Sequence, residues 1–328
     1  HADQPTTTPR AFGVHEDRGF AVGAGSKIFV TNGGLAEIFT ITASTPGLGG
    51  ARRGHSLLVL ERGDEGIEVA AEEHKLGLRG SSTTSLHLDD LRLPMERIIG
   101  TPGQGMTQLA HVLAWGRTAM AAGCVGTGRA SLALVLEQVS TREQFGKPIG
   151  AFEVVRNQVA DIFSLHYTME ALVRRTAAAE VDRPLLAARS TAAKVFCSEG
   201  AGEIADMAIQ LHGGSGYIEE TGVALLLRDG RITRIFEGPN DVLLVHAGLG
   251  VFTTPSTRQP LGAESVAGAF DAGLEADDMA ARTAALRDAL LKEQGIRAAR
   301  LQREMHRLGR LFVLQEACDA AVLRARAE

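Results

Sequence analysis

The chain has 328 residues, 45% of them hydrophobic and 22% charged, which allows two or three globular domains and excludes wholesale disorder. Its formal net charge of −5 provides no general positive field for holding nucleic acid. Cys124, Cys197 and Cys318 lie far apart and lack Cys-x-x-Cys spacing, so we expect neither a disulfide framework nor a metal site.

Residues 1–98 have the pattern of an antiparallel β-domain. Short runs rich in β-branched and apolar residues alternate with Gly-rich segments, which is typical of a sandwich or an open barrel. The expected strands are Lys27–Asn32, Glu37–Thr42, Ser56–Leu60 and Thr83–Leu88. Pro94 closes this region.

Residues 99–252 have helical periodicity. One apolar face recurs at three- and four-residue steps, which predicts an amphipathic helix. Its members are Val155, Val159, Ile162, His166, Met169 and Val173. Further helices are expected over about 104–140 and about 189–212, and long helices with short connections favour a bundle. The predicted fold class is therefore α+β.

Residues 253–328 are expected to form a linker and a helical extension. The extension carries an apolar stripe of Leu301, Met305, Leu308 and Phe312. Arginines surround the stripe at positions 297, 300, 303, 307 and 310. Such a helix can lie on an anionic membrane or pack against a dimer partner, and both interpretations stay open. Since no apolar run approaches about 20 residues and no signal peptide is visible, a cytoplasmic, bacterial-type location is expected.

The first segment with chemical potential is Arg228–Asp241, which contains Glu237. Glu237 follows Phe236 and precedes a Gly-Pro turn. A carboxylate against apolar surface is disfavoured as the anion, so its pKa is expected to rise toward that of a general base. The alternative is a loop carboxylate that pairs with Arg231 or Arg234.

Two other segments could hold a ligand. In Gln210–Tyr217, adjacent glycines let the backbone approach a flat ring or a phosphate, whereas a helix C-cap would need only one glycine. In Arg142–Ile149, a basic turn between two helices could clamp a diphosphate or be a solvated loop.

Together and in this order, these three segments resemble the signatures of the acyl-CoA dehydrogenase family. The residues around Lys27–Asn32 and Leu86–Pro94 also resemble strands of its middle domain, so the resemblance covers about residues 10–250. Finer features, from Ser26 to Thr40 and beyond residue 260, look like the very-long-chain branch.

The resemblance implies FAD as cofactor and Glu237 as catalytic base. It also implies substrate contacts from Arg117 and Gly238. The implied cofactor contacts are Phe29, Val30, Thr31, Arg142, Gln144, Phe145, Gln210, Leu211, His212, Gly213, Gly214, Pro239, Asn240 and Asp241. Of these, Arg142, Gln144, Phe145 and the run 210–214 would reach the FAD of a neighbouring subunit.

The reaction implied is dehydrogenation of a fatty acyl-CoA to a trans-2-enoyl-CoA in fatty acid β-oxidation. The thioester oxygen would be stabilised by the backbone N–H of the base and a flavin hydroxyl, and the β-hydride would pass to the flavin. Electron-transferring flavoprotein is the implied electron acceptor, and a homo-oligomeric dimer or tetramer the implied assembly.

The sequence departs from the family pattern in two places. The N-terminal helical domain and a Thr-Glu-Pro…Gly-Ser-Asp flavin segment either lie outside the given sequence or are lost by truncation, and Pro239 stands where the family has a threonine. Proline removes a backbone donor, so a weaker flavin contact is expected there. These departures favour a second hypothesis, a catalytically impaired flavin- or CoA-binding scaffold or subunit.

Overall fold

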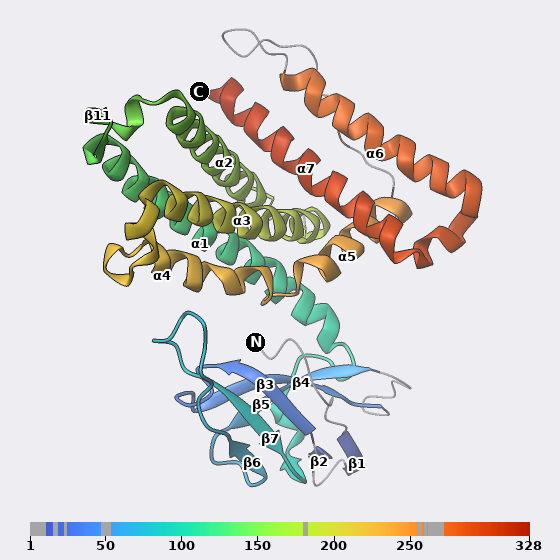
Figure 1. Ribbon diagram of the computed structural model, residues 1–328. Coiled ribbons are helices and arrows are strands. Elements are labelled where there is room, and N and C mark those ends of the chain that lie inside the picture. The colour runs from blue at the N-terminus through green and yellow to red at the C-terminus, as the bar shows by residue number, and fades with distance from the viewer. Residues whose placement is uncertain are drawn as a thin grey trace. The chain divides into compact units, whose positions relative to one another are not determined.

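The structure is a computed structural model that describes residues 11–15, 19–22, 25–46, 54–179, 183–254, 258, 261 and 272–328. The chain forms two compact units, residues 1–113 and residues 114–328 (Figure 1). Strands are the main regular elements of the first unit and helices are those of the second. The α+β class is thereby confirmed, whereas the domain limits expected at 98 and 252 stay predictions.

The first unit is built from antiparallel strands. They are β1 (Ala11–His15), β2 (Gly19–Val22), β3 (Gly25–Thr31), β4 (Ile38–Ser44), β5 (His55–Glu61), β6 (Ile67–Val69), β7 (Thr83–Leu88), β8 (Leu91–Leu93) and β9 (Ile98–Ile99). They form three-stranded sheets in the orders β1-β2-β8, β3-β7-β6 and β4-β5-β9. The four expected strands are confirmed as β3, β4, β5 and β7.

The core of this unit follows the two-residue period of its strands. In β4, Phe39, Ile41 and Ala43 are buried and alternate with more exposed neighbours. They pack with Leu58, Leu60, Leu86 and Leu91, each of which is fully buried. One face of β3 and of β4 is therefore anchored in this core.

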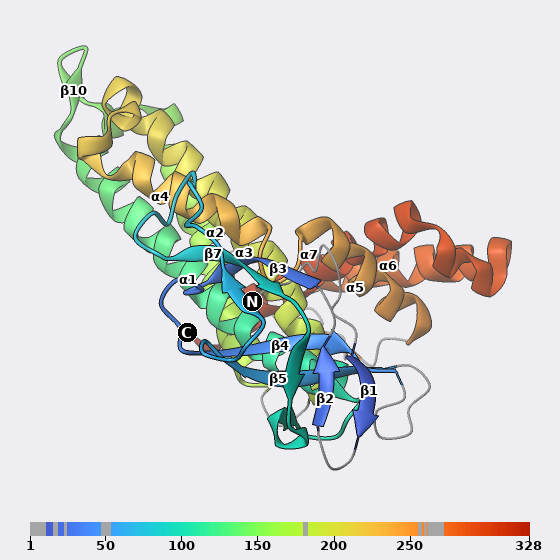
Figure 2. The same ribbon diagram turned by 90° about the horizontal axis from the view of Figure 1, so that it is seen from below.

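Helices form the second unit and the connection into it. They are α1 (Gly105–Thr141), α2 (Glu153–Ala177), α3 (Arg183–His212), α4 (Val223–Gly230), α5 (Asn240–Thr253), α6 (Ala272–Gln294) and α7 (Gln302–Ala327). Short strands β10 (Glu143–Gln144) and β11 (Lys147–Pro148) separate α1 from α2 as a hairpin (Figure 2). The three expected bundle helices are confirmed, although α3 begins before residue 189, in a first turn that contains Pro184.

The predicted apolar face of α2 is the one that enters the bundle core. Ile162, Met169 and Leu172 are fully buried there. By length and composition alone α1 could cross a membrane, with a mean hydropathy of 1.4 over its most apolar 18 residues. From the sequence, no apolar run long enough to span a bilayer was expected. In the structure, Ala121 and Val135 of α1 are fully buried in the same core.

The C-terminal extension is helical, as expected, and it packs on the bundle. Figure 1 shows α6 and α7 side by side, and α7 also lies against α5, α2 and α3. Met305 and Leu308 are fully buried with Phe252 of α5 and Leu290 of α6. Met305 and Leu308 of the apolar stripe therefore pack within their own chain, whereas Leu301 is exposed, and the membrane and dimer-partner interpretations of the extension stay predictions.

Candidate active site

Glu237 lies in a short loop between the 3-10 turn η6 (Arg231–Arg234) and helix α5. Its backbone φ is +56° and that of Gly238 is +99°, so two consecutive residues are left-handed. For a residue with a side chain this conformation costs roughly 1–2 kcal/mol. Strain of this kind persists only where surrounding contacts fix it, and it concentrates at functional sites.

Two cationic side chains from other helices hold the loop. Arg117 of α1 donates from Nε to the backbone carbonyl of Glu237 over 3.0 Å. Lys194 of α3 donates from Nζ to the carbonyl of Gly238 over 2.8 Å. Hydrogen bonds from charged donors are the stronger kind, so consecutive carbonyls of the turn are anchored at two points.

The Glu237 side chain is turned into the helical unit and is only 8% exposed. Its carboxylate lies against Gly116 of α1, where a Cβ atom would come within 3.0 Å of Oε2. A larger residue at this position would therefore occupy the space of the carboxylate. Glycine lets the helix backbone and the acid approach each other closely.

Lys194 is the main positive charge buried beside this loop. The pKa of Lys194 is lowered to about 8, chiefly by burial and also by the charge of Arg117, whereas Cys124, Glu237 and Glu199 act in the opposite direction. Lys194 is fully buried. Glu237 is among the groups whose charge acts on Lys194, so its carboxylate lies within electrostatic range of this buried cation.

Asn240 and Asp241, predicted as cofactor contacts, have other partners in the structure. The amide Nδ2 of Asn240 donates to Ser198 Oγ at 3.0 Å and to Glu199 Oε1 at 3.3 Å. Its Oδ1 accepts from Lys194 at 2.6 Å. Because both ends of the amide are engaged inside the chain, the side chain of Asn240 supports the loop, and its predicted cofactor contact stays a prediction. Asp241 is exposed and lies 3.5 Å from His306 Nε2.

In the β-unit, the predicted flavin contacts lie at an irregularity of β3. The pairing of β3 with β7 shifts register between Lys27 and Val30, and Phe29 within the shift has a φ of +56°. Phe29 is 60% exposed, whereas Val30 is buried. An exposed aromatic side chain on a strained bulge is a feature typical of ligand sites.

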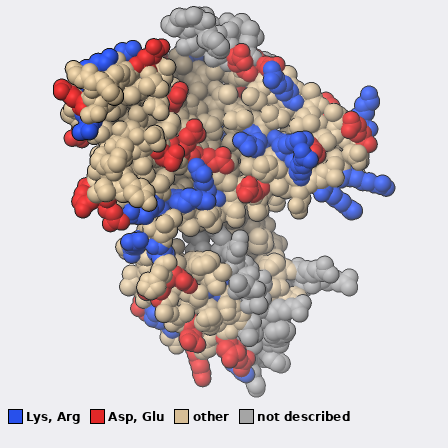
Figure 3. Space-filling view, viewed as in Figure 1, with Lys and Arg blue, Asp and Glu red and all other residues tan. Residues whose placement is uncertain are grey.

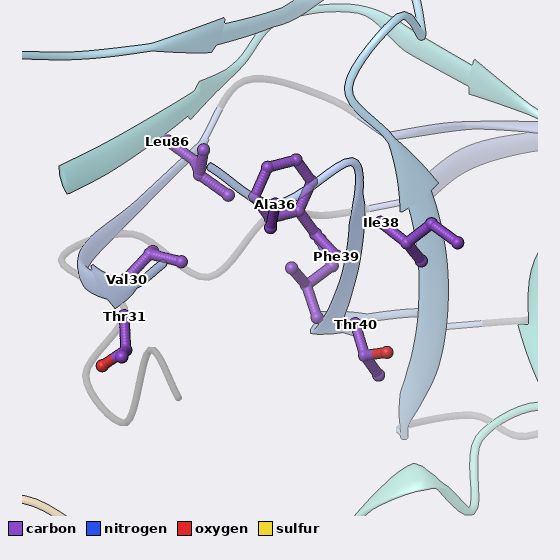
Figure 4. Close-up of a pocket in the computed structure, with 8 residues that line it drawn as sticks. Val30, Thr31, Ala36, Ile38, Phe39, Thr40 and Leu86 are labelled. Carbon is purple, nitrogen blue, oxygen red and sulfur yellow. The ribbon is translucent and has the colours of Figure 1, made fainter. Parts of the chain in front are cut away.

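A cavity of about 120 Å³ opens beside this bulge (Figure 4). It is lined by Val30, Thr31, Ala36, Ile38, Phe39, Thr40, Ile41 and Leu86. Figure 4 shows these side chains coming from β3, β4, β7 and the turn before β4. Pockets for whole organic ligands are about 300–1,000 Å³, so this cavity can accept one apolar edge of a larger flat molecule.

The basic turn is confirmed as the β10–β11 hairpin, and its predicted residues point outward. Arg142, Gln144 and Phe145 are exposed, and Phe145 is 92% exposed with a φ of +51°. Its ring meets Phe152 edge-on at 6.1 Å between centroids. An aromatic side chain presented this way is available to a molecule outside the subunit.

The run from Gln210 to Gly214 lies at the C-terminal end of α3. Gly213 has a φ of +60° and continues the chain past His212 as a left-handed C-cap. A Cβ on Gly213 or Gly214 would meet nothing within 4 Å, so this backbone is open. The side chain of Leu211 is buried in the bundle core, and its predicted cofactor contact stays a prediction. His212 Nδ1 is bonded to the Ala208 carbonyl at 2.7 Å.

Comparison with known proteins identifies the family. The model for the acyl-CoA dehydrogenase middle domain matches residues 4–91, and that for the acyl-CoA dehydrogenase C-terminal domain matches residues 103–249. Together the two matches cover more than two thirds of the chain. The chain belongs to the acyl-CoA dehydrogenase family.

Individual family members are similar over most of this chain. The human very long-chain specific acyl-CoA dehydrogenase, mitochondrial, is 37% identical over 233 residues, which are 69% of this chain and 35% of the relative. Butyryl-CoA dehydrogenase from Megasphaera elsdenii superposes with a TM-score of 0.70 at 32% identity, over 75% of this chain and 63% of that one. The chain thus spans about a third of the length of the curated relative.

A further structure shows the same fold over nearly the whole chain. The acyl-CoA dehydrogenase from Bacillus anthracis, solved as a complex with FAD, superposes with a TM-score of 0.86 at 24% identity. The superposition covers 99% of this chain and 59% of that one, so it includes α6 and α7. The middle and C-terminal domains of the family fold are therefore both present.

Several residues of this family site were not predicted from the sequence. Gly116, Lys194 and Ser198 support the loop from helices that are distant in sequence. The one available signal was Lys194, a single charge between Ala193 and Val195 in an otherwise apolar helical run. A lone lysine in such a run is expected to have a specific buried partner.

Proposed function

We propose that this chain catalyses the flavin-dependent α,β-dehydrogenation of a fatty acyl-CoA, with Glu237 as the base that removes the α-proton. The observation that carries the proposal is Glu237 itself, a buried carboxylate on a left-handed residue whose carbonyl is held by Arg117. A carboxylate with only a structural role has no need of this strain, whereas a base has to be held in one geometry.

The residues present fit FAD as the cofactor. The cavity beside Val30 and Thr31 accepts a flat apolar edge, and the open backbone at Gly213 and Gly214 admits a close approach by a diphosphate or a ring. Phe29 and Thr31 would flank the isoalloxazine. The exposed residues of the β10–β11 hairpin, with the end of α3, would hold the FAD of a neighbouring subunit. Bound FAD supplies the acceptor for the β-hydride.

The chain's own part in the reaction is proton removal at a fixed position. The α-C–H bond of the thioester breaks, its proton passes to the Glu237 carboxylate, and the electron pair enters the new α,β double bond as the β-hydride leaves. A Cβ at Gly238 would lie 3.1 Å from Leu243 Cδ2, so the missing side chain lets the turn beside the carboxylate pack closely against α5. Burial of the acid excludes water from the proton transfer.

Finer aspects of the function are part of the same proposal. The human relative is specific for very long-chain acyl-CoA, which supports a long acyl chain as the substrate, and fatty acid β-oxidation is the pathway proposed with it. Family membership supports electron-transferring flavoprotein as acceptor and a homo-oligomer. The three free cysteines support a reducing, cytoplasmic compartment. Figure 3 shows Lys and Arg side chains over the end of α6 and the start of α7, which supports an electrostatic membrane contact there.

Flavin reduction by a long-chain acyl-CoA tests the proposal. Purified chain is loaded with FAD, and palmitoyl-CoA is added without oxygen while the yellow flavin absorbance is followed. We expect bleaching, and a loss of about 10²- to 10⁴-fold in its rate for Glu237→Gln. Glu203→Gln, an exposed carboxylate on α3, is the control and should bleach normally. FAD binding without bleaching would favour the scaffold hypothesis instead.

A further inference from the structure

Lys194 is a buried charged residue beside the Glu237 loop that has no part in the proposed proton transfer. It lies in the middle of α3 and is fully buried. Its Nζ donates to the Gly238 carbonyl at 2.8 Å and to Asn240 Oδ1 at 2.6 Å. A buried ammonium is unfavourable unless such acceptors compensate for the loss of water, so the contacts have to be maintained with good geometry.

The acceptors of Lys194 are themselves held in place. Asn240 points its Oδ1 at Lys194 because its amide nitrogen donates to Ser198 and Glu199. These two residues stand one turn after Lys194 on α3, since a helix turns once in about 3.6 residues. One helix therefore fixes both the first residue of α5 and the carbonyl of Gly238, on either side of Pro239.

We propose that Lys194 is a positioning residue for Glu237: its ammonium fixes the left-handed turn that carries the carboxylate, and loss of its proton loosens that turn. The catalytic role of Lys194 rests on the proposed function, whereas its role in ordering the loop does not. Arg117 anchors the carbonyl before the turn's glycine and Lys194 anchors the glycine's own carbonyl. Without Lys194, Gly238 is free to move because glycine has little conformational preference.

The charge of Lys194 makes this anchor dependent on pH. Burial lowers its pKa to about 8. The titratable and charged groups that act on it are Cys124 and Arg117 of α1, Glu199 of α3 and Glu237 of the loop. Below pH 8 the ammonium makes charge-assisted bonds, and above it a neutral amine makes weaker ones. The order of the loop should therefore decline as the pH rises through about 8.

The titration of Lys194 changes global stability in the opposite direction to loop order, so the two effects can be distinguished. Because the pKa of Lys194 is lower in the folded chain, the unfolded chain binds more protons between pH 8 and 10.5. The contribution of this one group to stability therefore increases with pH across that window. A loop that loosens while this contribution increases cannot be explained by general unfolding.

Amide hydrogen exchange of the full chain tests the positioning role. Exchange in residues 236–241 is measured relative to residues 162–172 of the core helix α2, so that the intrinsic effect of pH is removed. For Lys194→Met we expect faster exchange of the loop by about ten- to a hundred-fold, the equivalent of one lost charge-assisted hydrogen bond. Lys194→Arg should recover part of the protection, and the exposed Lys292→Met should leave it unchanged.

The wild-type chain provides a test that does not depend on any variant folding. Its loop protection should decline from pH 7 to pH 9 while that of the reference helix is constant. Equal protection across this range, or loop exchange in Lys194→Met equal to wild type, would overturn the proposal. In the dehydrogenation assay, kcat of Lys194→Met should decrease more than KM changes. If wild type does not bleach flavin, the proposed function fails, and the exchange data still decide the role of Lys194.

Discussion

At the residue scale, Gly116 allows the sharpest test of how tightly the carboxylate is placed. Its Cβ position is 3.0 Å from Glu237 Oε2 and 3.3 Å from Cδ, so Gly116→Ala must displace the acid by a few tenths of an ångström. Only a flexible side-chain end has to move, and the fold should be retained. We expect flavin reduction to slow by about ten- to a hundred-fold, because small misplacements of reacting groups reduce the rate by such factors.

The matched control for this substitution is Gly126→Ala on the same helix. A Cβ at Gly126 would meet nothing within 4 Å. The control should keep its activity and gain up to about 1 kcal/mol of helix stability. Stopped-flow bleaching gives the rates and urea unfolding gives the stabilities. Equal rates for the two alanine variants would show that the carboxylate is not constrained by α1.

The sequence could predict Glu237 as the candidate base but not what surrounds it. The acid stands in a contiguous motif, which can be recognised from one stretch of chain. The side chains that hold its loop come from distant segments. Arg117 is 120 residues from the Glu237 carbonyl that it binds, and Lys194 is 44 residues from the Gly238 carbonyl. Asn240 was attributed to the cofactor because it belongs to the motif, whereas packing against α3 gives its amide internal partners. Contacts between distant segments depend on packing that no local pattern encodes.

At the element scale, the crossing of α5 and α7 depends on two glycines. A Cβ at Gly309 would come within 1.9 Å of the Leu244 carbonyl, and one at Gly248 would come within 1.7 Å of the Met305 carbonyl. Backbone atoms cannot move aside as a side chain can. Gly309→Ala should therefore lower the free energy of unfolding by about 1–3 kcal/mol or more, as overpacking does.

Urea unfolding of Gly309→Ala and Gly248→Ala measures this effect. The control is Gly250→Ala, two residues along α5, where a Cβ would meet nothing within 4 Å and stability should be unchanged or higher. Because α5 begins at Asn240, a displaced α5 should also slow flavin reduction. A variant that is as stable as the control would mean that the helices are farther apart than described.

Helices and strands were largely predictable because their periodicity is local. The alternation in β4 and the three- and four-residue steps in α2 identified both elements and their buried faces. The partner of the α7 stripe was not predictable, since a row of Met305 and Leu308 suits a membrane, a second subunit or its own chain equally well. Phe252 and Leu290 decide the question, and they come from two other helices.

At the scale of the whole molecule, a buried ion network joins the C-terminal extension to the bundle. Arg258 makes a bidentate pair with Asp319 of α7 at 2.7 and 2.8 Å, and these hydrogen bonds raise the pKa of Arg258. Arg175 of α2 lies 3.6 Å from the same carboxylate and donates to Glu316 of α7 at 2.9 Å. Partners 61 and 141 residues apart meet here, which composition and net charge could not predict.

Asp319→Ala should therefore destabilise the second unit as a whole. Asp319 is 1% exposed, and its removal leaves the partly buried Arg258 and Arg175 without their shared carboxylate. Loss of one partner from a buried pair costs about 3–5 kcal/mol. An exposed helical pair of Asp278 with Arg282 provides the control, and Asp278→Ala should change stability by only about 0.3–0.5 kcal/mol.

Urea unfolding combined with hydrogen exchange distinguishes a joined extension from an independent one. If the network makes α7 part of the bundle, wild-type α2, α3 and α7 lose protection in one transition, and Asp319→Ala shifts that transition for all three helices. If α7 of wild type unfolds in a separate, earlier step, or if the two alanine variants are equally stable, the extension is an appendage. The extension could then not stabilise α5, and the loop of Glu237 would be held from α1 and α3 alone.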